Sequence, residues 1–290
     1  PATVRATVER ALDAYDPDVL DCSSADVVPL LAAIGVDLGR RAGYRKLAGE
    51  STFVSYGQVG HSPARYDVPG RAIVDRSNSF LLGHSGMAGL TYFVETAGKP
   101  IQEVATDSIG GVLTALEIRK ARERDVLAPW QKRQTERFKS LETLHAADRG
   151  GFTFQPDVGD LAGAGRGGAA RLAGRNSVHE DVHELDFASL YPNVIRRYGV
   201  SPETVCCDCH DTADVPELGY SVCPDAANRG PGNPDGEGSF LGDVLGPLLD
   251  DRRGWKRRLR DADDGTDTTD LEAKVEAVKW VLVSCFGYQG

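Results

Sequence analysis

The sequence predicts a mixed α+β fold. Over residues 50–95, short stretches of β-branched and aromatic residues alternate with turn residues, which is typical of strands. Residues 108–127 and the last 50 residues instead repeat apolar side chains at helical spacing among charged ones. Between these two parts, the apolar Leu185 runs into a lone carboxylate, Asp186. We expect this carboxylate to stand at the end of a strand.

The expected elements follow from these patterns in chain order. They are a helix over 4–15, a short strand at 19–20, a helix over 25–34, strands at 51–56, 71–74 and 90–94, a long helix over 108–127, and two antiparallel helices over about 243–263 and 270–285. The last two helices are expected to pack through Leu248, Trp255, Val275, Val278 and Leu282. Residues 160–176 and 225–239 are rich in glycine and lack periodicity, so we expect flexible surface loops.

Composition narrows the class of protein. The formal net charge is −10, with 43 acidic residues against 33 basic ones. This balance argues against a uniformly basic surface and leaves room for a local basic groove. The acidic surface, with few lysines, leads to the hypothesis of a halophilic, archaeal source. There is no apolar run near the roughly 20 residues that span a bilayer, so we expect a cytoplasmic protein without a membrane partner. Because the chain opens at Pro1 without Met and stops soon after a helical segment, we expect a portion of a longer protein.

Four cysteines lie close together in the sequence: Cys206, Cys207, Cys209 and Cys223, with His210 beside them. Thiolates are good zinc ligands, but structural zinc sites usually show two matched Cys-x-x-Cys pairs. This spacing does not show them. Three states therefore stay open: a zinc site, a disulfide to Cys223, and free thiols, which a reducing cytosol favours.

The most informative segment is 183–192, His-Glu-Leu-Asp-Phe-Ala-Ser-Leu-Tyr-Pro. A carboxylate at a strand end can hold Mg²⁺, and backbone N–H groups after it can face a phosphate chain. The pattern Asp-Phe-x-Ser-Leu-Tyr-Pro resembles the first catalytic motif of family B DNA polymerases. The alternative is a strand that ends in a proline turn, with Asp186 as a helix N-cap.

A second motif lies in the basic stretch at 252–258. On a helix, Arg252 and Lys256 are four residues apart and share a face, which suits the β- and γ-phosphates of a nucleotide. The alternative is a solvated basic helix.

A third motif lies near the end of the chain and is similar to Lys-x-x-x-Asn-Ser-x-Tyr-Gly of the same family. Lys279, Ser284 and Gly287 agree with it, Phe286 replaces the tyrosine and Val283 replaces the asparagine. Loss of the asparagine removes a polar contact. We therefore expect reduced selectivity or efficiency of nucleotide incorporation.

The resemblance implies roles for the residues of the first motif. Asp186 would be the catalytic carboxylate and a ligand of two Mg²⁺ ions. The backbone from Phe187 through Ser189 to Leu190 would bind the triphosphate, and Tyr191 would pack under the sugar and exclude a 2′-hydroxyl.

The resemblance also assigns the remaining motif residues and the substrates. Arg252, Lys256 and Lys279 would neutralise the phosphates, while Val283 and Phe286 would line the nascent base pair. The implied substrates are dNTPs and primer–template DNA.

The resemblance also divides the chain. It implies a degenerate, RNase H-like exonuclease domain over 1–110 and, over 111–184, a linking helix, a glycine-rich turn and a flexible insertion. A palm portion over 185–242 and fingers helices over 243–290 would follow. The glycine-rich turn at Gly150, Gly151 and Phe152, like Gly287, is expected to contact DNA. An ordinary β-turn at residues 150–152 is the alternative.

The exonuclease motifs of the family are largely absent. Only Asp26 and Asp75 remain as candidates, and two-metal hydrolysis needs several converging carboxylates, so we predict no nuclease activity. The second catalytic carboxylate of the family lies beyond its Tyr-Gly motif and is not found here. The expected function is therefore DNA-templated DNA polymerisation by an incomplete chain that is inactive alone. The alternative is a non-catalytic nucleotide- and DNA-binding remnant, or a split-polymerase subunit whose second chain supplies the rest of the palm and the thumb.

Overall fold

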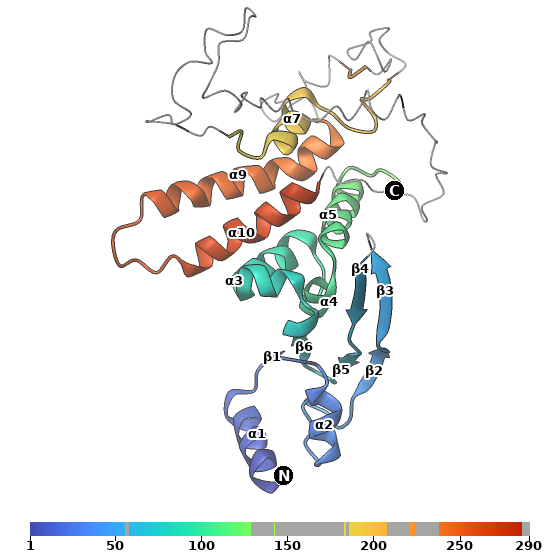
Figure 1. The fold of residues 1–290 in the computed structure, drawn as a ribbon, viewed down its shortest axis with the longest axis vertical. Helices are drawn as coiled ribbons and strands as arrows, with labels where there is room; N and C mark the ends of the chain where they lie inside the picture. The colour runs from blue at the N-terminus through green and yellow to red at the C-terminus, as the bar shows by residue number, and fades with distance from the viewer. Residues whose placement is uncertain are drawn as a thin grey trace, which may run out of the picture.

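The computed structural model describes residues 1–55, 58–128, 142, 183, 186–207, 221–223 and 238–285. Within these residues the named strands all lie between Val19 and Asp75, and the longer helices follow them (Figure 1). The mixed α+β prediction is confirmed. No helix in the described ranges is both long and apolar enough to cross a membrane.

The first part contains both helices and strands, and the elements after it are helical. The first part contains α1 (Ala2–Tyr15), β1 (Val19–Cys22), α2 (Val27–Ala33), β2 (Arg45–Ala48), β3 (Ser51–Ser55), β4 (Gln58–Ser62), β5 (Arg65–Asp67), β6 (Ala72–Asp75) and the short 3₁₀ helix η1 (Arg76–Asn78). The rest contains α3 (Phe80–Ala97), α4 (Ile101–Thr106), α5 (Ile109–Glu123), α7 (Leu190–Tyr198), α9 (Phe240–Arg260) and α10 (Thr269–Ser284).

The strands form three two-stranded sheets. β1 and β6 pair in parallel, with Val19 opposite Ala72 and Cys22 opposite Asp75. β2 pairs with β5, and β3 with β4, in antiparallel register. The β3–β4 hairpin projects beside the helices (Figure 1).

The strand predicted at 90–94 is wrong, because these residues lie within α3. Their β-branched and aromatic side chains favour a strand locally, but Leu90, Phe93 and Ala97 recur at helical spacing and are buried. Ser79 caps the start of this helix by accepting a hydrogen bond from the Leu82 N–H at 3.3 Å. Tertiary burial has therefore overridden local propensity.

α5 is shorter than the helix predicted over 108–127. Ser108 caps its start, and the helix ends at Glu123. Asp125 then has a positive φ of 54°, which does not continue a right-handed helix, and Leu127 is almost fully exposed. The apolar residues 126 and 127 extended the pattern without contributing to the core.

One hydrophobic core joins α3, α4 and α5 to α9 and α10, which form an antiparallel hairpin over them (Figure 1). The predicted contacts of Leu248, Val278 and Leu282 lie in this core. Trp255 packs against the same core, edge-on to Tyr92 of α3, with ring centroids 4.9 Å apart. Val275 faces a cavity that is described below. A smaller core lies around α2, β5 and β6.

Candidate functional site

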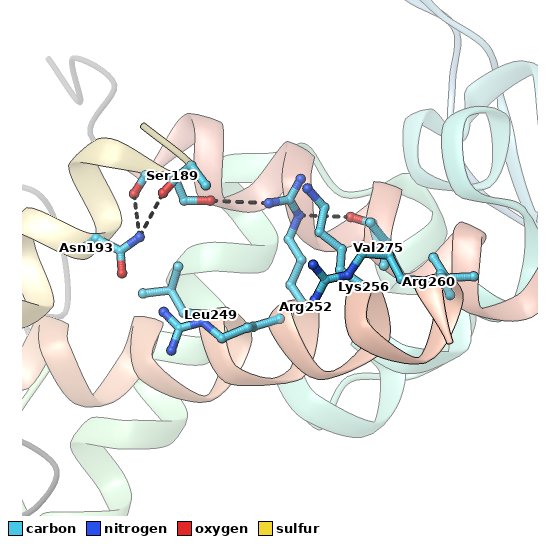
Figure 2. A pocket seen from close by; sticks show the side chains of 10 residues that line it. Ser189, Asn193, Leu249, Arg252, Lys256, Arg260 and Val275 are labelled. Carbon is cyan, nitrogen blue, oxygen red and sulfur yellow. Dashed lines mark hydrogen bonds between the residues drawn. The ribbon is translucent and has the colours of Figure 1, made fainter. Parts of the chain in front are cut away.

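A cavity of about 590 Å³ lies between the N-terminus of α7, the second half of α9 and α10 (Figure 2). Four of its lining residues are basic, and all four come from α9. The lining residues are Ala188, Ser189, Asn193, Leu249, Arg252, Arg253, Lys256, Leu259, Arg260 and Val275. In the described part of the chain, this is where the sequence-predicted residues Ser189, Arg252 and Lys256 meet.

The basic wall of the cavity follows from helical geometry. Ser239 caps α9 by accepting a hydrogen bond from the Gly242 N–H at 3.2 Å, and the helix then continues unbroken to Arg260. Residues four apart on a helix share a face, so Arg252, Lys256 and Arg260 form one row. The prediction identified the first two members of this row. Arg260 was missed, although the same spacing continues to it.

Arg252 bridges the helices around the cavity. Its Nη1 donates to the Ser189 hydroxyl at 3.3 Å, and its Nε donates to the Val275 carbonyl at 3.4 Å (Figure 2). Burial lowers the pKa of this guanidinium, and the nearby Glu276 carboxylate partly opposes that effect. The side chain is thus held in place, half-buried, at the centre of the site.

Lys256 lies in a strongly positive environment. The Arg252 guanidinium is the largest cause that lowers the pKa of this ammonium, followed by burial and by the charges of Lys279 and Arg260. Cations held this close repel one another, and an anion between them removes the repulsion. The arrangement is therefore suited to binding a multiply charged anion.

The N-terminus of α7 opens onto the same cavity. Ser189 has left-handed backbone angles (φ 51°, ψ 51°), an uncommon conformation for a residue other than glycine. The Asn193 amide stabilises this turn by donating to the carbonyls of Ala188 at 2.9 Å and Ser189 at 3.1 Å. The N-terminal end of a helix carries a partial positive charge that attracts anions, so the backbone of α7 adds to the positive field of α9.

A bidentate ion pair fixes α7 to α9. The Arg196 guanidinium donates to both carboxylate oxygens of Asp250, at 2.7 and 2.8 Å, and this contact lowers the pKa of Asp250. The loop after α7 adds two bonds to the start of α9. The Glu203 carboxylate accepts from the Phe240 N–H at 2.6 Å, and the Ser201 hydroxyl accepts from the Leu241 N–H at 3.1 Å.

The other residues of the first motif lie around the start of α7. Asp186 and Phe187 precede this helix, and both are exposed. Leu190 and Tyr191 form its first turn and are about half-exposed. The alternative in which Asp186 caps the helix is wrong, because Ser189 occupies the N-cap position. Residues 184 and 185, on which the expected strand depends, lie outside the described residues.

Asp186 is an incomplete donor set for Mg²⁺. Each ion takes several oxygen ligands in a near-octahedral array. Within the described ranges, no group of three or more His, Cys, Asp or Glu is arranged to hold a metal ion. Asp186 can therefore supply one ligand of the expected magnesium site and does not fit as the whole of it.

α10 places the third predicted cation beside the cavity. Lys279 follows Val275 by four residues, and Val283 follows Lys279 by four, so the three share a face of the helix. Lys279 and Val283 are each about half-exposed. Phe286 and the DNA-contacting candidates Gly150, Gly151, Phe152 and Gly287 lie outside the described residues.

The carboxylates of the first part have local structural contacts. The Asp75 Oδ1 accepts from the Ser77 N–H at 2.9 Å and from its hydroxyl at 2.7 Å, which caps η1. Asp26 is exposed at the start of α2 and shares a hydrogen bond with Ser24. The absence of nuclease activity stays a prediction.

The cysteine segments run side by side. Val205 bridges Val222 in antiparallel fashion, and the Cys223 N–H donates to the Thr204 carbonyl at 2.8 Å. This brings the backbones at Cys206 and Cys223 near each other. Cys209 and His210 lie outside the described residues, so the zinc hypothesis stays a prediction.

Comparison with known proteins identifies the family. A model described as DNA polymerase family B matches residues 108–290, which is more than half of the chain. The chain belongs to DNA polymerase family B. The matched range contains α5, α7, α9 and α10, and therefore every element around the basic cavity.

Archaeal polymerases are among the relatives of this family B chain. DNA polymerase 1 of Pyrococcus abyssi is 27% identical over 217 residues, which cover 74% of this chain and 24% of the relative. DNA polymerase 2 of Saccharolobus solfataricus is 28% identical over 192 residues, covering 66% and 23%. The chain thus spans about a quarter of the length of the curated relatives it matches.

A solved structure supports the fold. The family B DNA polymerase from Pyrobaculum calidifontis superposes with a TM-score of 0.54 and 19% identity, covering 98% of this chain and 40% of the other. At this identity the match is evidence for the fold alone. It extends over the first part of the chain, where the sequence motifs of the family are weak.

Proposed function

We propose that this chain carries the nucleotide-binding part of a DNA-templated DNA polymerase, which transfers a nucleotide from a dNTP to a primer 3′-hydroxyl. The observation that carries the proposal is the basic cavity between α7 and α9. Membership of the polymerase family narrows its anion to a nucleoside triphosphate. In this proposal α9 and α10 are the fingers, the segment around Asp186 belongs to the palm, and residues 1–110 are a degenerate exonuclease-like domain.

Each side chain then has a role that its position allows. Arg252 and Lys256 bind the β- and γ-phosphates and stabilise the leaving pyrophosphate, with Lys279 joining them from α10. The backbone from Phe187 to Leu190, at the start of α7, binds the triphosphate, and the exposed Tyr191 packs under the sugar. Positioning and charge neutralisation are the main requirements of phosphoryl transfer, and both are supported by this geometry.

Metal chemistry is expected from the family, with two Mg²⁺ ions activating the 3′-hydroxyl and the leaving group. Asp186 would be a ligand of both ions. We expect the other ligands, and most contacts to primer–template DNA, from residues outside the described ranges.

A second candidate function is favoured by two specific observations. Within the described ranges Asp186 is not part of a group of three or more side chains that could hold a metal ion, and the family asparagine is replaced by the exposed Val283. Both fit a nucleotide- and DNA-binding remnant, or a subunit that acts with a second chain. This candidate would be favoured if the chain binds nucleotide and does not extend a primer even when Mg²⁺ is added.

The test of the proposal is nucleotide binding to the chain by titration calorimetry. We expect dCTP and inorganic tripolyphosphate to bind, and Arg252→Ala or Lys256→Ala to weaken binding by roughly 10- to 100-fold, the usual effect of losing a charge-assisted hydrogen bond. Arg258→Gln is the matched control, because this exposed cation lies on the same helix and outside the cavity lining. Equal losses in all three variants would reduce the site to general charge attraction and overturn the proposal.

A further inference from the structure

One acidic residue lies among the cations of the site. Glu276 is on α10, directly after Val275, whose carbonyl accepts the Arg252 Nε–H. Both carboxylate oxygens of Glu276 accept hydrogen bonds from the Lys279 Nζ, at 3.0 and 3.2 Å. The same carboxylate acts electrostatically on Arg252. Glu276 therefore contacts or faces two of the three cations assigned to the triphosphate.

This contact accounts for the position of Lys279. Its charge lies near enough to act on Lys256, yet Lys279 is not part of the cavity lining. Its ammonium is bound to Glu276 beside the cavity. The third phosphate-binding cation is thus already neutralised by a carboxylate of the same helix.

The pair is placed where it can open. The side chain of Lys279 is 47% exposed and that of Glu276 is 36% exposed. Exposed ion pairs between residues three apart on a helix are weak, because water screens both charges. A triphosphate carries several negative charges and can replace one carboxylate as the partner of the ammonium.

We propose that Glu276 is an internal competitor of the triphosphate: it holds Lys279 while the site is empty and releases it when a nucleotide binds. The inference rests on the proposed function of the cavity. It makes Glu276 an affinity-determining residue that acts through Lys279. On binding, the Lys279 ammonium exchanges the carboxylate for a phosphate oxygen, and the freed carboxylate becomes hydrated.

The test measures binding of inorganic tripolyphosphate and dCTP to the whole chain. Glu276→Gln keeps the shape of the side chain and removes its charge, so we expect about two- to fivefold tighter binding, the range that an exposed pair supports. Glu272→Gln is the matched control. Glu272 lies one turn earlier on α10 and accepts a hydrogen bond from the Thr268 hydroxyl at 2.9 Å. We expect it to leave affinity unchanged.

A double variant separates competition from a structural effect. Lys279→Gln should weaken binding, and Glu276→Gln should lose most of its gain when Lys279 is already replaced, because the carboxylate then has no ammonium to hold; the remaining gain measures its electrostatic effect on Arg252. Glu276→Ala is a second variant, chosen because alanine favours a helix. Its affinity shows whether the gain depends on the glutamine side chain, and its melting temperature shows whether the fold is retained.

The outcomes are distinguishable. The proposal that Glu276 competes with the triphosphate would be overturned by unchanged or weaker binding of Glu276→Gln, by an equal gain in Glu272→Gln, or by a gain that is undiminished when Lys279 is replaced by glutamine. If Arg252→Ala and Lys256→Ala still weaken binding in that case, the proposed function stands. If those two variants bind as tightly as the unmodified chain, the function of the cavity itself is wrong.

Discussion

Individual residues around the cavity show how a charge cluster is held without its ligand. Arg252 has protein acceptors in the Ser189 hydroxyl and the Val275 carbonyl, so its guanidinium is partly satisfied before any anion arrives. Lys256 has its pKa lowered by the neighbouring cations. Neutralising groups placed in advance cost no reorganisation during the reaction.

Val283 replaces the asparagine of the family motif. It is 53% exposed on the face of α10 that also carries Lys279, so an asparagine there faces solvent or substrate without disturbing the core. If the chain extends primers, we expect Val283→Asn to raise the efficiency of correct incorporation by a few-fold, since one polar contact is restored. Single-nucleotide incorporation kinetics measure this, with Val283→Thr as the shape control. No gain from asparagine would contradict the assigned role.

Two half-buried thiols, Cys22 and Cys285, provide a pH-dependent test of the structure. Burial raises the pKa of Cys22 to about 11, with Asp75 and Asp21 adding to the effect, and burial raises the pKa of Cys285 to about 11. At pH 8 about one such thiol in a thousand is ionised. We expect iodoacetamide to modify both slowly, with a rate that rises about tenfold per pH unit up to pH 10. Peptide mass spectrometry, with the exposed Cys206 as the internal reference, measures the rates.

At the scale of elements, the contact between α3 and α10 positions the site. α10 packs along α3, and the close approach occurs where Gly89 faces Ala277. A Cβ on Gly89 would lie 2.9 Å from the Ala277 Cβ and 2.5 Å from the Ser85 Cβ. A glycine is therefore needed here for packing.

Gly89→Ala should destabilise the fold by about 1–3 kcal/mol, because the helices must move apart. Gly83→Ala, in the helical stretch that precedes the kink of α3 at Gly86, is the control. An added Cβ there meets nothing within 4 Å, and alanine favours a helix by roughly 0.5–1 kcal/mol. Urea unfolding followed by circular dichroism compares the two. If the free energy of unfolding changes by a similar amount and with the same sign in both variants, the close packing of Gly89 against Ala277 is not the cause.

The start of α9 is the second element with a clear local cause. Ser239 accepts from the Gly242 N–H, and Asp243 in the first turn pairs with Arg124. We expect Ser239→Ala to cost about 1 kcal/mol of unfolding free energy. Ser239→Asp, which keeps an acceptor, should retain most of the stability; equal losses in the two variants would show that the cap hydrogen bond is not the cause.

At the scale of the whole molecule, a net charge of −10 coexists with a local cluster of cations. The acidic excess keeps the chain hydrated, while the cluster concentrates anions at one place. We propose a halophilic origin from this balance. Far-ultraviolet circular dichroism should show loss of helix on dialysis into low salt, and an unchanged spectrum and melting temperature would count against it.

The ligand should stabilise the whole chain, because the cavity joins α7, α9 and α10 into one site. A triphosphate at 100 times its Kd adds about 2.7 kcal/mol to the free energy of unfolding. For a chain of this size, that raises Tm by roughly 5 °C. Differential scanning calorimetry with tripolyphosphate measures this. Lys256→Ala should lose most of the shift at the same ligand concentration, and a full shift in that variant would place the ligand elsewhere.

The sequence by itself determined the family, the two long C-terminal helices and the row from Arg252 to Lys256, since these depend on motifs and spacing within one segment. Only the tertiary structure decided that 90–94 is helical, that Ser189 is in contact with Arg252, and that Glu276 of α10 lies close enough to act on Arg252 of α9. These facts depend on which distant segments meet. Packing between elements, unlike the periodicity of a single helix, leaves no local signal in the chain.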